Sequence, residues 1–171
     1  MAHILPSPLH ADDLFEIVVQ PSQHVQMGIP LRTSRDDAMA MAAQACAWSV
    51  RHEGRLIACF GIVEMFAGAQ GHGWCQLASN LGAAHLPLTR FMRRVLAESP
   101  LARVDLIAAA NDAENLIKRF GPMDPGMLLE AVLAQPTREC SWARLLGFTP
   151  AAVLRKWGAA SETHVLFERV R

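Results

Sequence analysis

Residues 72–96 constrain the fold of this chain more than any other stretch. Residues 72–79 alternate loosely between apolar and polar side chains, as a β-strand does, and small residues follow at 82–84. Apolar side chains then recur at the spacing of one helix face: Leu88, Phe91, Met92, Val95 and Leu96. A strand, a small-residue turn and a helix form an anion site where the free N–H groups of the first helical turn meet a ligand, and pyrophosphate is the usual anion of that size. Many α/β proteins contain the same unit and bind nothing there, so whether this unit binds an anion has to be judged from the rest of the chain.

Composition excludes several classes of function. The 171 residues suit one domain, and Lys plus Arg equals Asp plus Glu at 16 each. A chain without net charge gives no electrostatic reason to bind nucleic acid or an anionic membrane. No apolar run approaches the roughly 18 residues of a membrane span, and the first residues lack a signal-peptide pattern. We therefore expect a cytoplasmic protein of one domain, residues 1–171.

Cysteine and histidine spacing predicts neither disulfides nor a metal site. The four cysteines lie far apart without a CxxC pair, and each has apolar or small neighbours. The seven histidines show neither HxxxH nor HExxH spacing. We expect buried, reduced thiols and no metal.

The remaining sequence predicts an α/β (α+β) protein. Strands are expected at 3–5, 48–52, 55–64, 103–110, 148–156 and 163–170, in addition to 72–79. Helices are expected at 10–19, 34–45, 87–99, 111–120, 127–134 and 138–146, with a loop at 21–32. The strand–helix–strand unit across 72–110 implies a right-handed crossover and one parallel strand pair.

This order of elements and three motifs resemble the GNAT superfamily of N-acetyltransferases. Residues 79–84, Ser-Asn-Leu-Gly-Ala-Ala, are similar to the family's pyrophosphate loop, Gln/Arg-x-x-Gly-x-Gly/Ala. Residues 142–148, Trp-Ala-Arg-Leu-Leu-Gly-Phe, resemble its helix end, and the last hairpin looks like its paired C-terminal strands. The resemblance covers nearly the whole chain, and the C-terminal part looks especially like GNAT-like proteins encoded by bacteriophages. It implies a mixed, mostly antiparallel central sheet with helices on both faces.

The resemblance also implies acetyl-CoA as co-substrate, with its pantetheine chain between two splayed strands. The strand before the helix would pair with pantetheine, and the loop N–H groups would hold pyrophosphate. The residues that match these positions are Leu77, Ala78, Ser79, Leu81, Gly82, Ala83 and Ala84. Small side chains suit the loop because phosphate must reach the backbone. Ser79 departs from the family's Gln or Arg, and Pro87 fits only if the helix begins near Leu86.

Catalysis in this family needs a base for the acceptor amine and often a tyrosine that protonates the leaving thiolate. Glu64 is the first candidate base and His72 the second, although a solvated strand-end carboxylate and a turn histidine are the alternative interpretations. The family's tyrosine position corresponds to Ala143, and the chain contains no tyrosine. Cys140 and Ser141 are poor acids for that step.

Two functions of different classes remain open. The first is an acyl-CoA-dependent N-acetyltransferase whose amine acceptor is a peptide N-terminus, lysine, polyamine, amino acid or antibiotic. The second is a non-catalytic GNAT-like structural or interaction protein, such as a phage virion component. The extra residues 111–137 would then form a partner or self-association surface, and otherwise a lid. A nucleic-acid function is disfavoured, because a face carrying Arg90, Arg93 and Arg94 is usually just solvated.

Overall fold

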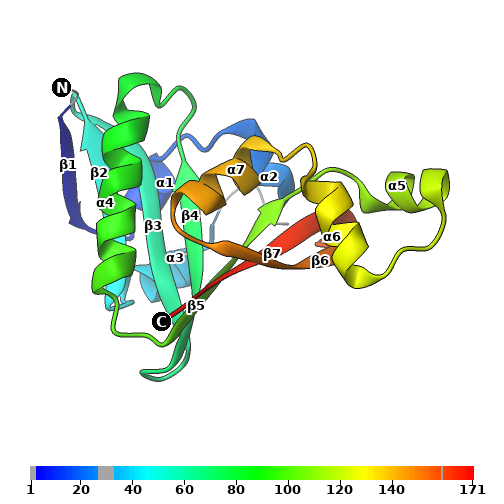
Figure 1. Cartoon of the computed structure of the whole chain (residues 1–171). Helices are drawn as coiled ribbons and strands as arrows, with labels where there is room; N and C mark the ends of the chain where they lie inside the picture. The colour runs from blue at the N-terminus through cyan, green and yellow to red at the C-terminus, as the bar shows by residue number, and fades with distance from the viewer. Residues whose placement is uncertain (1–2, 27–32, 159) are drawn as a thin grey trace.

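The structure, a computed structural model, describes residues 3–26, 33–158 and 160–171 around one seven-stranded sheet (Figure 1). The strand order is β1-β2-β3-β4-β5-β7-β6, and β4 with β5 is the parallel pair in an otherwise antiparallel sheet. The strands are β1 (Ile4–Pro8), β2 (Cys46–His52), β3 (Arg55–Phe66), β4 (Gln70–Leu77), β5 (Arg103–Ala109), β6 (Thr149–Trp157) and β7 (Glu162–Val170). The predicted fold class, a mixed and mostly antiparallel sheet with flanking helices, is confirmed.

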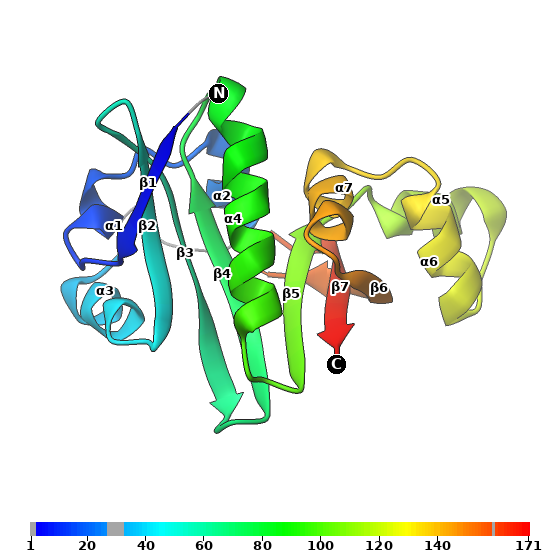
Figure 2. The same cartoon turned by 60° about the vertical axis from the view of Figure 1, so that its left-hand side comes forward.

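Helices cover both faces of the sheet, as Figure 2 shows with the strands edge-on between α4 and the pair α1 and α3. The helices are α1 (Asp13–Glu16), α2 (Pro21–Gln26), α3 (Arg35–Ala42), α4 (His85–Glu98), α5 (Ala113–Phe120), α6 (Pro125–Leu133) and α7 (Arg138–Leu145). A 3₁₀ turn, Gly82–Ala84, leads into α4. None of the described helices is long and apolar enough to cross a membrane.

The main core lies between the sheet and α4. The predicted face of this helix is buried throughout, and Leu88 is fully enclosed. Phe91 makes edge-to-face contacts with Trp48 and Phe60, with ring centroids 5.5 and 5.8 Å apart. Such aromatic pairs add to the stabilisation from buried apolar area. The contacts fix α4, and with it the loop that precedes it, against the sheet.

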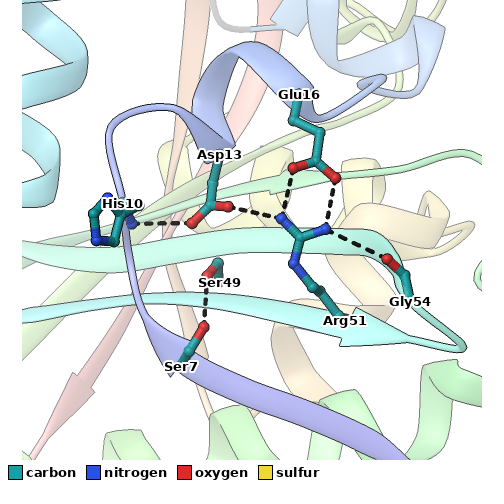
Figure 3. Close-up of polar contacts among 7 residues, drawn as sticks. All are labelled: Ser7, His10, Asp13, Glu16, Ser49, Arg51 and Gly54. Carbon is teal, nitrogen blue, oxygen red and sulfur yellow. Dashed lines mark hydrogen bonds and ion pairs between the residues drawn. The ribbon is translucent and has the colours of Figure 1, made fainter.

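A charged cluster holds α1 on the opposite face of the sheet (Figure 3). Arg51 on β2 donates to the Asp13 carboxylate at 3.0 Å and to both oxygens of Glu16 at 2.6 Å. Asp13 also accepts the backbone N–H of His10, which closes the turn before the helix. A helix of one turn cannot persist alone, so these tertiary bonds and the buried Leu14 keep it in place.

Two predictions near the N-terminus were wrong in extent. The helix expected at 10–19 ends at Glu16, because the chain becomes extended at Ile17 and Val19 pairs with Ala78 in an isolated bridge. Residues 21–26 of the expected loop form α2, and the rest of that loop, 27–32, lies outside the described residues. Both changes bring the segment after α1 against the end of β4.

The extra residues 111–137 form α5 and α6 at the end of the sheet away from β1 (Figure 2). Leu128, Val132 and Leu133 of α6 are buried in the main core. Glu114 of α5 binds Arg155 of β6 through two hydrogen bonds of 2.6 and 2.9 Å. This segment is therefore packed into the domain and lines no part of the large cavity described below.

Candidate functional site

The sheet opens into a cleft between β4 and β5. These parallel strands pair only at Gln70–Arg103, Gly71–Val104 and His72–Asp105, and then diverge. Each strand stays paired on its outer side, β4 with β3 and β5 with β7. A cavity of about 840 Å³ opens where the two inner edges separate, with further walls from α4 and α7. Its volume is that of a typical small-molecule site.

A histidine–aspartate pair marks the point where the two strands separate. His72 Nδ1 lies 2.5 Å from Asp105 Oδ1, and Gln70 Nε2 donates to the other carboxylate oxygen at 3.0 Å. Asp105 is held by both neighbours, and His72, about 36% exposed, lines the cavity. With the carboxylate accepting from Nδ1, a neutral imidazole keeps its lone pair on Nε2. The geometry is that of a base with an orienting carboxylate.

Glu64, the first candidate base, is placed elsewhere. It lies at the far end of β3, where its carboxylate accepts the backbone N–H of Gly68 in the β3–β4 turn at 3.0 Å. The side chain is solvent-exposed and does not line the cavity. The structure thus brings His72 to the cleft and leaves Glu64 at the hairpin tip, where its contact serves the turn.

The inner edge of β4 is already hydrogen-bonded to the segment around α2. Gln23 donates from Nε2 to Cys75 O at 2.9 Å, and its Oε1 accepts the Leu77 N–H at 2.6 Å. The backbone N–H of Gln20 donates to Leu77 O at 2.8 Å. The backbone N–H of Ala78, the next residue along, donates to Ile57 O on β3, so this N–H points away from the cleft. One carboxamide therefore satisfies two groups that an inserted extended ligand would otherwise bind.

Only some of the residues predicted to bind the cofactor, at the end of β4 and in the loop before α4, line the cavity. Leu77, Ala78 and Leu81 line the cavity, whereas Ser79, Gly82, Ala83 and Ala84 do not. The Ala84 N–H donates to Leu81 O within the 3₁₀ turn, so it is not available to a ligand. Gly82 adopts φ +49°, in the left-handed region that favours glycine. The helix begins at His85, which places Pro87 within the first turn, where its missing N–H costs nothing.

A cation anchors this loop from β3. Arg55 donates from Nη2 to Asn80 O at 2.9 Å and from Nη1 to Ser79 O at 3.5 Å. Arg55 is exposed, so its charge also reaches solvent beside the loop. Ser79 provides no cationic side chain of its own, and Arg55 places one at the same turn.

The α7 wall of the cavity carries no acid equivalent to tyrosine. Ala143 lines the cavity at the expected position. The Ser141 hydroxyl donates to Thr137 O at 2.8 Å, and the Cys140 thiol donates to Ala109 O at 3.3 Å. On β4, burial raises the pKa of the Cys75 thiol well above its ordinary value, so this lining thiol stays neutral. The cavity thus offers no activated cysteine nucleophile among the described residues.

Three residues of this site were missed in the sequence. Asp105 had a signal, because it is the one carboxylate within the apolar strand 103–109. Gln23 and Arg55 had none, since each acts through a contact with a distant loop or strand. The described residues contain no group of three His, Cys, Asp or Glu side chains that could hold a metal ion.

Comparison of the sequence with protein-family models and with curated proteins finds no match. Solved structures do match. A GNAT-family acetyltransferase from Bacillus anthracis superposes with a TM-score of 0.59 at 12% identity, over 99% of this chain and 96% of the other. An aminoglycoside 6′-N-acetyltransferase complexed with coenzyme A gives 0.64 at 10% identity, over 97% and 96%. The ribosomal-protein-S5-alanine acetyltransferase from Vibrio fischeri gives 0.62 at 13% identity, over 99% and 94%. At these identities the likeness establishes one thing, the fold.

Proposed function

We propose, from the GNAT fold and the histidine–aspartate pair in its cleft, that this chain is an acyl-CoA-dependent N-acetyltransferase. The observation that carries the proposal is the position of His72, at the point where β4 and β5 separate and inside the cavity. Acetyl-CoA is the proposed acetyl donor. It would pair with the inner edge of β4 at Leu77 once the glutamine contacts there are released, and its pyrophosphate would bind the backbone of Gly82 and Ala83 beside the cavity.

The reaction we propose is direct transfer to an amine. The amine nitrogen attacks the thioester carbonyl, the N–C bond forms, and the C–S bond breaks. His72 Nε2 takes the proton that the amine loses and returns it to solvent. Asp105 keeps the imidazole in the tautomer that has its lone pair on Nε2, and it stabilises the imidazolium that forms. A neutral Cys75 thiol is consistent with a route that has no acyl-cysteine intermediate.

The leaving thiolate receives no proton from a tyrosine in this chain. With Ala143 at the corresponding position and Ser141 engaged with the backbone, the thiolate leaves as an anion and takes its proton from water. Thiolates are good leaving groups, so this step proceeds without a dedicated acid. A general acid typically contributes about 10²- to 10⁴-fold in rate, so we expect modest turnover.

The test is the variant His72→Gln, assayed for thiol release from acetyl-CoA with a panel of amines. We expect kcat to fall by about 10²-fold or more, the usual contribution of a general base, with the Kd for acetyl-CoA unchanged. Phe120→Ala is the matched control, because Phe120 is an exposed ring on α5 that does not line the cavity. Equal activity of His72→Gln and wild type would remove His72 from the chemistry.

A second candidate function is favoured by the hydrogen bonds on β4. Gln23 and Gln20 satisfy the edge that pantetheine would use, as in a protein that keeps the GNAT fold as a scaffold. In that case the chain is a structural or interaction protein, for example a component of a phage virion, and the segment 111–137 carries the contact. Two results together would favour this candidate over the enzyme. The chain would not bind acetyl-CoA at millimolar concentration, and its self-association or its binding to a partner protein would be lost when residues 119–124 are deleted.

A further inference from the structure

The wall of the cleft that carries His72 and Asp105 continues as an apolar surface. Side chains two positions apart on a strand share a face. Trp74 therefore lies on the His72 side of β4, and Ile107 lies on the Asp105 side of β5, and both line the cavity. Trp157, at the end of β6, completes this wall and is 47% exposed at the mouth.

The Trp74 indole occupies the space that a side chain on the neighbouring strand would fill, because the residue there is Gly61. A Cβ built on Gly61 would lie 2.9 Å from Trp74 Nε1 and 3.0 Å from Cζ2, so the indole rests where any side chain at position 61 would be. Trp74 Nε1 is buried and has no hydrogen-bond partner among the described residues. The indole thus presents a fixed ring to the cavity, apolar except for this one N–H.

Among the described residues that line this wall, none is a carboxylate, and Glu162, the cross-strand neighbour of Trp157, lies outside the lining. The Asp105 carboxylate is bound by His72 and Gln70, and Glu168, its neighbour on β7, pairs with Arg103 at 3.0 Å. Residues 17–23, which lead into α2 and contribute Gln20, Ser22 and Gln23 to the lining, include no Asp or Glu. Among the described lining residues the one carboxylate is Glu139, on α7 at the opposite wall. A ligand with several ammonium groups would leave most of them without a counter-charge, which is costly away from water.

We infer that the acceptor is a primary amine carried on an aromatic or bulky apolar body, and not a polyamine, an aminoglycoside or a lysine-rich peptide. This inference rests on the proposed function, because His72 defines which wall faces the amine. The reacting nitrogen is placed at His72, and the apolar body lies against Trp74, Ile107 and Trp157. Substrate selection then comes from apolar contact together with the absence of counter-charges for additional ammonium groups.

The experiment measures binding of two amines to the full chain, 2-phenylethylamine and spermidine, by calorimetry. We expect 2-phenylethylamine to bind at least about tenfold more tightly, since one well-packed ring is worth about a factor of ten in affinity. Trp157→Ala should weaken its binding about fivefold or more by removing the outer part of the wall. Phe120→Ala, which removes an exposed ring on α5 that does not line the cavity, should leave it unchanged. Spermidine binding as well or better, or no binding of the aromatic amine, overturns the inference.

Failure of this inference can be told apart from failure of the proposed function. Amine binding is measured without acetyl-CoA, so it does not depend on turnover. If acetyl-CoA binds and thiol is released only with polycationic amines, the acetyltransferase proposal holds and the acceptor inference is wrong. If the aromatic amine binds in a Trp157-dependent way and acetyl-CoA does not bind, the cleft has the inferred selectivity and the enzymatic proposal fails.

Discussion

Gln23 offers the sharpest test of how this cleft admits a ligand. Its carboxamide makes two hydrogen bonds with the inner edge of β4, one to Cys75 O and one from the Leu77 N–H. A pantetheine amide that pairs with this edge needs the same two groups. Binding of acetyl-CoA by the wild type therefore includes the cost of releasing Gln23, and Gln23→Ala removes that cost in advance.

The size of the effect follows from the two bonds. A neutral hydrogen bond contributes about 0.5–1.5 kcal/mol net, so two of them represent about 1–3 kcal/mol. Each 1.4 kcal/mol is about a factor of ten in affinity, so Gln23→Ala should bind acetyl-CoA roughly 5- to 150-fold more tightly. The same bonds hold the α2 segment against β4, so the variant should also melt at a lower temperature without ligand.

Isothermal titration calorimetry with acetyl-CoA provides the Kd, and differential scanning fluorimetry provides the melting temperature. The matched control is Gln44→Ala, which removes another carboxamide that donates to a backbone carbonyl, Ala40 O at 3.0 Å, but which lies just after α3 and does not line the cavity. It should leave the Kd unchanged. If Gln23→Ala binds acetyl-CoA no more tightly than the wild type, then Gln23 and the ligand do not compete, and pantetheine does not use this edge.

Three further results are expected. Gly82→Trp should weaken acetyl-CoA binding by about tenfold or more in calorimetry, because a bulky residue at a positive φ distorts the loop and blocks approach to its N–H groups; retained affinity would remove the loop from the site. Asp105→Asn should lower kcat by about 10-fold or more with little change in the Kd for acetyl-CoA, since the imidazole loses its orienting carboxylate. If kcat and affinity for acetyl-CoA fell to the same extent, Asp105 would have a general structural role instead. Arg51→Ala should lower the melting temperature near pH 7. The hydrogen bond from Arg51 holds the pKa of Glu16 below its ordinary value of 4.5, so this contribution is present above the unfolded pKa and is lost as the pH falls through the folded pKa. The melting-temperature gap between the variant and the wild type should therefore narrow as the pH falls below 4.5, and a gap that persists once Glu16 is protonated would point to packing instead.

The sequence predicted the parts of this fold that local patterns determine. The apolar stripe on 85–98 is a strong periodic signal, and α4 has the predicted buried face. Glycine and proline marked the ends of α5, α6 and α7 closely enough to place all three helices. The hairpin around Glu53 and Gly54 was equally local, and both residues adopt the positive φ that such a turn needs.

The site was less predictable because its residues act through long-range contacts. Asp105 meets His72 only because two strands distant in sequence run parallel for three residue pairs. Gln23 lies in the segment 21–32 that was expected to be a loop, and its contact with β4 depends on how α1 ends at Ile17. Glu64 was chosen because it ends a strand near the expected site. The extra length of β3, which continues to Phe66, carries it into the hairpin turn.

Because β4 and β5 pair over only three residues, His72 and Asp105 also belong to the contact that connects the two parts of the sheet. The sheet consists of two slabs, β1–β4 and β5–β7, connected at this seam by the three rungs from Gln70–Arg103 to His72–Asp105. The imidazole belongs to one slab and its carboxylate to the other. A ligand that moves the two parts of the sheet apart would first strain the His72–Asp105 pair, because this pair lies next to the opening. If His72 is the base, its orientation by Asp105 depends on the width of the cleft, and a ligand too thick for the cleft should disturb this contact.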